Sequence, residues 1–171
     1  MRLTNTTMCI KRLICLVLSG IMLLMLCACS AQSNQSISLY DLNKSMSEVA
    51  EFSQMKYASS ADDDPEDLFE NISEMSYSKV EGFFINYAVN GTGNADEIAC
   101  IQVKDKRDIN EAVASLNAHL KKRIGLYTSY DKSQLDKLSN AVVATKGNIA
   151  VLIVGDKSGE MEKAFYSFFE E

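Results

Sequence analysis

Four consecutive residues, Leu26-Cys27-Ala28-Cys29, have types and spacing that suit a covalent modification. They end an apolar run that starts at Leu13, and three basic residues precede this run. A basic segment, an apolar segment and a small residue at the cleavage point make a secretory signal peptide. Because a cysteine directly follows the small Ala28, the pattern is that of a bacterial lipobox. We therefore expect diacylglycerol to be attached to the Cys29 thiol and the chain to be cleaved before this residue.

The apolar run before the lipobox is too short to cross a bilayer. It covers residues 13–26, which are fourteen positions, whereas a spanning helix needs about 20. An ordinary cleaved signal and an uncleaved anchor are the alternatives to a lipoprotein signal. We expect three parts: a lipoprotein signal peptide over residues 1–28, a lipidated polar tether over 29–37, and a single domain over 38–171.

The charge balance excludes one class of partner. Removal of residues 1–28 leaves 14 basic against 23 acidic residues, a net charge of −9. Nucleic-acid binding requires a positive surface, so we expect no nucleic-acid partner. An acidic domain is also not attracted to anionic lipids. Attachment to the cell membrane must therefore come from the lipid on Cys29.

Cysteine usage leaves no intramolecular disulfide after processing. Of the five cysteines, three lie in the signal peptide and one carries the lipid, so Cys100 alone remains. It lies in an apolar strand pattern and is expected to be a small buried hydrophobic residue. A catalytic thiol is the alternative, but no histidine or carboxylate partner is evident near it.

The single histidine, His119, lies between apolar helix positions and close to a basic cluster. We expect it on the protein surface, with a general base as the alternative. One imidazole falls short of the usual ligand set of a metal site. We therefore expect no metal and no cofactor.

Two further patterns have a structural and a chemical interpretation. The acidic run Asp62-Asp63-Asp64 suits a solvated loop before a helix, and calcium binding is the alternative. The motif Gly91-x-Gly93 is typical of a hairpin turn rather than of a nucleotide-binding loop, because a strand follows it.

Hydrophobic periodicity divides the domain into helices and strands. Apolar residues recur at spacings of three and four where a helix buries one face, and they alternate where a strand does. Asp64 and Asp108 are expected to cap helices, and Gly125 to end the longest one. The expected helices span residues 39–52, 65–72, 109–124, 132–138 and 159–169, and the expected strands span 83–89, 97–104, 141–145 and 148–154.

A similarity between two segments of the chain indicates how these elements are arranged. Residues 98–106 and 149–157 align without gaps, and five of the nine positions are identical. Each segment ends a hairpin and leads into a helix. We therefore expect an α+β fold with two layers: a four-stranded antiparallel sheet built from two hairpin-helix (ββα) units, with one or two short helices before it. Both long helices are expected on one face of the sheet.

Two strand aromatics are candidates for a contact patch. Phe84 points to the opposite face from Phe83, whereas Tyr87 alternates in step with Phe83. If Phe84 is exposed, it marks a binding surface together with Tyr87. If the first helix covers it, Phe84 belongs to the core.

Several motifs of strand starts and turns are similar to those of a known family. They are Asp96-Glu97-Ile98-Ala99, Val103-Lys104-Asp105, Tyr130, residues 138–143 and Lys146-Gly147-Asn148, together with the lipobox. Through them the chain resembles a family of short lipoproteins from Firmicutes catalogued as a domain of unknown function (family 4358). Cys100 and Gln102 depart from the more aliphatic or charged strand that this resemblance leads us to expect. The resemblance implies a location and a fold, and no reaction.

The sequence favours a lipid-anchored protein on the extracytoplasmic face of the cell membrane. We expect a non-catalytic binding or accessory module of the cell envelope, whose partner is an envelope protein or a small ligand. An envelope hydrolase that uses carboxylates, drawn from Asp96, Glu97 and Asp131, is one alternative. A calcium-stabilised structural protein is the other.

Overall fold

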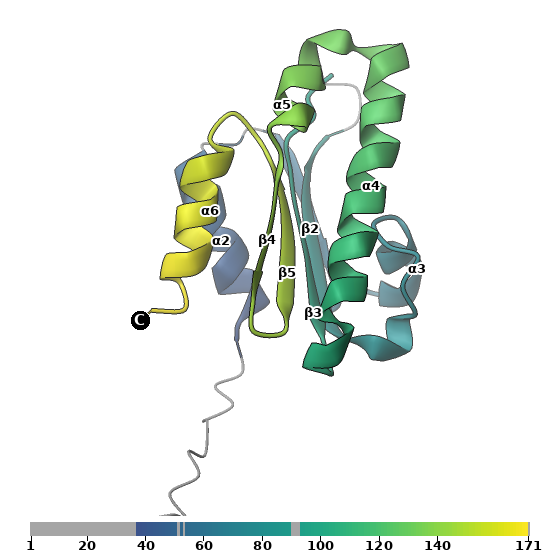
Figure 1. Cartoon of the computed structure of the whole chain (residues 1–171), viewed down its shortest axis with the longest axis vertical. Coiled ribbons are helices and arrows are strands. Elements are labelled where there is room, and N and C mark those ends of the chain that lie inside the picture. The colour runs from purple at the N-terminus through teal and green to yellow at the C-terminus, as the bar shows by residue number, and fades with distance from the viewer. Residues whose placement is uncertain (1–36, 51, 53, 90–92, 171) are drawn as a thin grey trace, which may run out of the picture. The chain divides into compact units, whose positions relative to one another are not determined.

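A five-stranded antiparallel sheet forms the centre of the domain (Figure 1). The computed structural model describes residues 37–50, 52, 54–89 and 93–170, which belong to a compact unit over Ile37–Glu171. The strand order is β1-β2-β3-β5-β4. The strands are β1 (Met55–Ser59), β2 (Val80–Ala88), β3 (Glu97–Val103), β4 (Val142–Lys146) and β5 (Ile149–Val154).

Helices cover both faces of this sheet (Figure 1). One face carries α2 (Leu39–Ala50) and α6 (Ser158–Ser167), which pack against each other. The other face carries α4 (Ile109–Tyr130), flanked by α3 (Pro65–Glu70) and α5 (Leu135–Ser139). Three short 3-10 turns connect these elements: η2 (Tyr77–Lys79), η3 (Lys106–Asp108) and η4 (Lys132–Gln134).

The core consists of two apolar clusters, one on each side of the sheet. Alternate residues of a strand point to opposite faces. In β3, Ala99 and Ile101 therefore meet Leu116 of α4, while Ile98 and Cys100 belong to the cluster with α2 and α6. Every residue of β5 is buried. Such a continuously apolar strand needs cover on both faces.

The α+β class and the antiparallel sheet are confirmed, but the two-layer arrangement is wrong. The two long helices, α4 and α6, lie on opposite faces of the sheet. Met161 and Phe165 of α6 pack with Leu42 and Met46 of α2 over the second apolar face. A two-layer fold would leave that face of β5 in water, so burial of apolar area requires the third layer.

The expected count of four strands is also wrong, because β1 is an additional edge strand. It pairs antiparallel with β2, from Met55 opposite Ala88 to Ser59 opposite Phe84. Most of its residues are exposed or half-buried. Lys56 and Ser59 give the segment no clear apolar alternation, so its pairing depends on β2 rather than on a local signal.

The expected caps of α3 and α4 are wrong in detail. Asp64 precedes α3 in a left-handed conformation, φ 52°, and its side chain makes no capping hydrogen bond. Asp108 precedes α4, but its carboxylate pairs with Lys79 at 3.2 Å instead. Its neighbour Asp105 caps the preceding 3-10 turn by accepting the backbone N–H of Arg107.

The expected end of the long helix at Gly125 is wrong as well. The helix α4 continues to Tyr130 because Tyr127 is buried against the core and its hydroxyl donates to the Asn94 carbonyl at 2.8 Å. Burial of one more turn outweighs the poor helix propensity of a single glycine, about 1 kcal/mol.

Replacing Gly125 with alanine is therefore expected to stabilise the protein by about 0.5–1 kcal/mol. A Cβ at this position would meet no atom within 4 Å, so the gain in propensity is not offset by a clash. Thermal or urea unfolding of the variant measures it. The same substitution at Gly147, where φ is +63°, is the control and should destabilise. An unchanged or lowered stability of G125A would contradict this account.

Candidate functional site

A buried group of charges joins the start of β3 to α4. The Glu97 Oε1 lies 2.8 Å from the His119 Nε2, and Oε2 lies 3.1 Å from the Arg123 Nη1. The three side chains are only 4%, 12% and 14% exposed, in that order. His119 and Arg123 are four residues apart on α4, which places them on one helix face. One carboxylate thus receives both α4 side chains.

A second ion pair lies beside this network. Lys137 of α5 places its Nζ 2.7 Å from Asp96 Oδ1 and 3.5 Å from Asp156 Oδ2. Asn94 donates to the other Asp96 oxygen at 2.7 Å. Among the described residues, Asp96 Oδ1 and Arg123 Nη1 make these ion-pair contacts without the geometry of a hydrogen bond.

The carboxylates that the sequence suggested for hydrolysis already have partners in this structure. Asp96 and Glu97 are neighbours, but each is neutralised by its own cation. Asp131 follows α4 and accepts the Ser133 hydroxyl at 2.7 Å and backbone N–H at 3.0 Å, which lowers its pKa. Each of the three carboxylates therefore has its own partners, and no two of them are free to act as an acid and base pair.

His119 is not the surface residue that its neighbourhood predicts. It is mostly buried, because Glu97 draws the ring toward the sheet. A signal in the sequence was available: Glu97 shares its strand face with the buried Ala99 and Ile101, and a charge on a buried face requires a partner. The choice of partner depended on how α4 crosses β3.

An open groove runs between α3 with its following loop and one side of α4. It consists of two adjoining hollows of about 250 and 410 Å³, which share Glu70, Ser73, Glu74, Met75 and Lys122 in their linings. We call it the acidic groove. One wall is formed by residues of the segment 66–77, and the α4 wall consists of Glu111, Ala114, Ser115, Ala118, His119 and Lys122.

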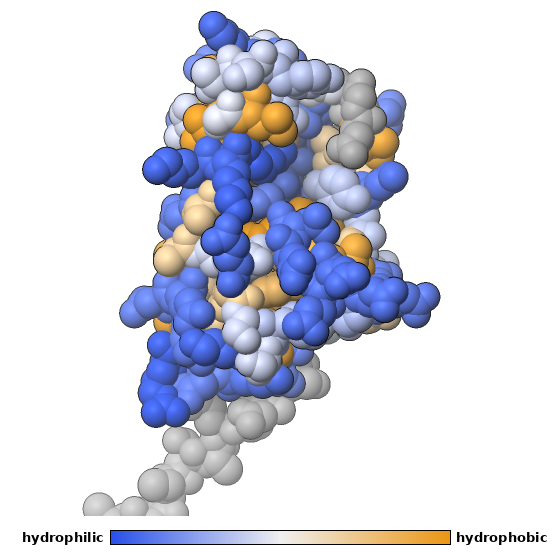
Figure 2. All heavy atoms as spheres, turned by 90° about the vertical axis from the view of Figure 1, so that its right-hand side faces the viewer, coloured by the Kyte–Doolittle hydropathy of each residue, from blue (hydrophilic) through white to orange (hydrophobic). Residues whose placement is uncertain are grey.

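The acidic groove has a mixed floor and a charged rim. Ile72 and Met75 are buried, and the Ser73 hydroxyl lies 2.5 Å from the Ser115 hydroxyl. On the side of the molecule that carries α3 and α4, hydrophilic side chains surround smaller apolar areas (Figure 2). Such a surface suits an extended polar ligand better than an enclosed apolar one.

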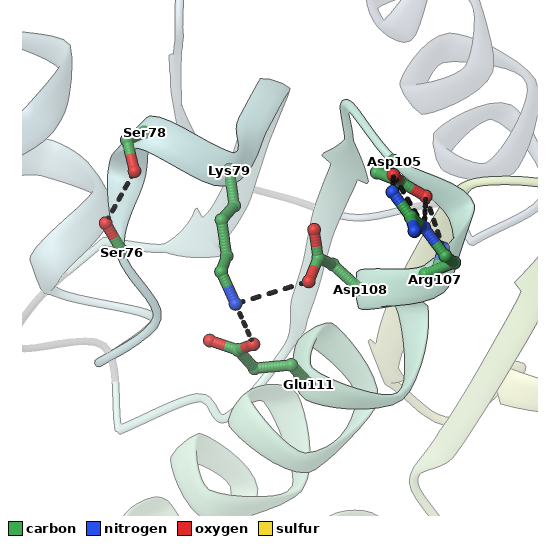
Figure 3. A network of polar contacts seen from close by, with 7 residues as sticks. All are labelled: Ser76, Ser78, Lys79, Asp105, Arg107, Asp108 and Glu111. Carbon is green, nitrogen blue, oxygen red and sulfur yellow. Dashed lines mark hydrogen bonds and ion pairs between the residues drawn. The ribbon is translucent and has the colours of Figure 1, made fainter.

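Lysine side chains already meet two of the groove's carboxylates. Lys122 donates to Glu74 at 2.6 Å, which lowers the pKa of this carboxyl. Near the other end, Lys79 reaches Glu111 at 2.5 Å and also Asp108 (Figure 3). Both carboxylates raise the pKa of the Lys79 ammonium through hydrogen bonds, Glu111 more than Asp108.

The pair Asp105–Arg107 gives a pH prediction that involves one exposed carboxyl. Arg107 donates to Asp105 from its guanidinium and its backbone N–H (Figure 3), and these bonds lower the Asp105 pKa from 3.8 to about 2. A lowered pKa contributes stability above pH 3.8 that is lost as the pH falls through 2. We expect Arg107→Gln to raise the Asp105 midpoint toward 3.8 in an NMR carboxyl titration.

Lys106→Gln is the control for this titration. It removes a neighbouring cation for which the structure shows no contact with the Asp105 carboxylate. An unchanged Asp105 midpoint in R107Q, or an equal shift in K106Q, would contradict the assignment.

The prediction that Phe84 is exposed and forms a contact patch with Tyr87 is wrong. Phe84 is fully buried between β2 and α2, in the second apolar cluster. Tyr87 is half-buried against the first cluster, on the other side of the sheet. The alternative that the first helix covers Phe84 is therefore the correct one, because α2 must bury Leu42 and Met46 somewhere.

The remaining candidates are Cys100, the acidic run over residues 62–64, and the positions Cys29 and Gly91, and the structure bears on each differently. Cys100 is buried and burial raises the pKa of its thiol, as the interpretation as a core residue requires. In the acidic run, Asp62 accepts the Ser59 backbone N–H at 2.6 Å, and the described residues contain no group of three or more side chains able to hold a metal ion. Cys29 and Gly91 lie outside the described residues.

A family model decides what the chain is related to. The model described as Domain of unknown function (DUF4358) matches residues 57–155, which is more than half of the chain. The chain belongs to this family. The DUF4358 match begins within β1 and ends at the residue after β5, so it contains β2 to β5, α3, α4, α5 and the pairing of Glu97 with His119 and Arg123, but neither α2 nor α6.

Other comparisons add no relative. No curated protein sequence and no solved structure matches the chain significantly. The DUF4358 match does not reach Cys29, so lipid attachment stays a prediction. Within the described part of the chain, none of the helices combines the length and apolar character needed to cross a membrane.

Proposed function

We propose that the protein is a lipid-anchored, non-catalytic binding or accessory module on the extracytoplasmic face of the cell membrane. The observation that carries this proposal is the position of Cys29 directly after Leu26-Cys27-Ala28, at the end of a short apolar run with basic residues before it. A single lipid of one or two chains holds the domain at the membrane. The polar tether keeps it near the surface.

The described domain supports binding better than catalysis. Its buried carboxylates, Asp96 and Glu97, are held by Lys137 and by Arg123 with His119. A general acid or base needs freedom to gain and lose a proton at the reacting group. The acidic groove, by contrast, is open, and no described cation pairs with Glu66 or Glu70 on its rim.

One observation favours a hydrolase as the second candidate. His119 is oriented by Glu97 and lines the same groove as the hydroxyls of Ser73 and Ser115. A carboxylate, an imidazole and a hydroxyl are the parts of a nucleophilic site. Covalent labelling of the protein by a fluorophosphonate probe, lost in Ser115→Ala, would establish the hydrolase. We expect no labelling.

The anchor is tested by growing a bacterial host with an alkyne fatty acid and detecting the labelled protein after click chemistry. We expect the unaltered chain to be labelled and to stay in the membrane fraction. Cys29→Ser should remove the label and block processing, because a hydroxyl is not alkylated in place of the thiol. Cys27→Ser, two positions earlier, is the matched control and should stay labelled. A labelled C29S variant would overturn the proposal.

A further inference from the structure

We propose that the acidic groove binds an extended cationic segment of a partner protein, through lysine or arginine side chains. This inference rests on the proposed function as a binding module, whose ligand it names. Its basis is the shape of the groove, the unmatched carboxylates on its rim, and the way that lysines of the chain itself already use the neighbouring carboxylates.

The groove has the length of a short extended peptide. Its α4 wall runs from Glu111 to Lys122. Eleven helical steps of about 1.5 Å give a wall of about 16 Å. An extended chain advances about 3.3 Å per residue. The groove therefore accommodates about five residues in extended conformation.

Its rim has more negative charge than the protein itself neutralises. Four glutamates and one lysine line the groove: Glu66, Glu70, Glu74, Glu111 and Lys122. Glu74 and Glu111 are paired with Lys122 and Lys79, but no described cation pairs with Glu66 or Glu70. These two lie four residues apart across α3, where like charges repel by a few tenths of a kcal/mol. A bound cation would relieve this repulsion.

The intramolecular pairs show which group the rim accepts. Both partners that reach the groove's carboxylates are primary ammonium groups, at 2.6 Å from Glu74 and 2.5 Å from Glu111. Glu111 lies at one end of the α4 wall and Lys122 at the other. A basic side chain of a ligand would make the same kind of contact with Glu66 and Glu70.

The floor adds a hydrogen-bonding group for a peptide. His119 is fixed through Nε2 by Glu97, and its other ring nitrogen has no hydrogen-bond partner among the described residues. This ring nitrogen faces no described partner and can form a hydrogen bond with the backbone of the ligand. Ala114 and Ala118 leave room beside it.

The test is fluorescence anisotropy with a labelled peptide of sequence Lys-Ala-Lys-Ala-Lys and the full chain in neutral detergent. We expect saturable binding that weakens with salt, and no binding of Glu-Ala-Glu-Ala-Glu. The double variant E66Q/E70Q should bind the lysine peptide about fivefold or more weakly, because two charge-assisted contacts are lost.

Two matched variants separate the groove from general attraction. D63N/E160Q removes the same number of charges from exposed positions that do not line the groove, and should change the affinity less than about twofold. Ala118→Leu narrows the groove without changing charge and should weaken binding, while unfolding temperatures confirm that each variant is folded.

Each of the following results would overturn the inference: no binding of the lysine peptide, equal effects of the two double variants, full affinity in A118L, or self-association of the chain that E66Q/E70Q abolishes. Peptide binding is measured without lipid attachment, and Cys29 labelling is measured without peptide. Failure of the groove and failure of the lipid anchor are therefore distinguishable.

Discussion

Phe84→Ala is expected to lower the free energy of unfolding by about 3–5 kcal/mol, the range for truncating a fully buried phenylalanine. Its side chain is 0% exposed and belongs to the cluster beneath α2 and α6. It also stacks on Tyr57 of β1 with ring centroids 5.9 Å apart. The cavity would remove contacts with both the edge strand and the helix layer. Urea unfolding monitored by circular dichroism measures the loss.

Leu126→Ala is the control for this measurement. Leu126 is a large apolar residue with 63% of its surface exposed on α4, so its truncation should change stability by about 0.5 kcal/mol or less. If F84A were as mild as L126A, Phe84 would not be a core residue. Its interpretation as part of a contact patch would then be reinstated.

Glu97→Ala should destabilise the protein by about 3 kcal/mol or more. The carboxylate is 4% exposed, and its removal leaves Arg123 and His119 without their common partner in a largely dry site. The cost comes from the unpaired guanidinium rather than from the lost attraction, since the intact pair gains little over its desolvation. Chemical unfolding at pH 7 gives the value.

The double variant Glu97→Ala/Arg123→Ala tests this reasoning. Once the guanidinium is removed together with its partner, no uncompensated charge stays behind. We therefore expect the stability lost in the double variant to be about 1–3 kcal/mol smaller than the sum of the losses in the two single variants. Strictly additive losses would mean that the two side chains do not depend on each other. Lys44→Ala, whose exposed pair with Glu48 spans 3.9 Å, should change little.

Local signals in the sequence were sufficient for most of the secondary structure. The helix expected over 39–52 is α2, and the strand expected over 148–154 is β5, with ends that differ by one or two residues. In both segments one short stretch of chain contains the whole apolar pattern. The edge strand β1 lacked such a pattern, because only Ser59 of its five residues is buried and its ladder hydrogen bonds come from β2.

Local sequence signals predicted only part of the candidate site. The sequence made Glu97 a candidate only as a carboxylate for hydrolysis, and not as the partner of a histidine and an arginine. His119 and Arg123 follow it by 22 and 26 residues. A single sequence contains no signal for which α4 side chain lies over which end of β3. The acidic groove was not predicted at all, since its two walls, α3 with its loop and α4, are separated by the hairpin of β2 and β3.

By itself, then, the sequence determined most of the helices and strands, the acidic balance, the lone Cys100 and the lipobox pattern at Cys29. The tertiary structure alone decided that α4 and α6 cover opposite faces, that Phe84 is buried, and that Glu97 pairs with His119 and Arg123. The physical reason is the same in each case. Both faces of β5 are apolar and must leave water, and the helix α4, which covers one of them, brings His119 and Arg123 to the start of the central strand β3.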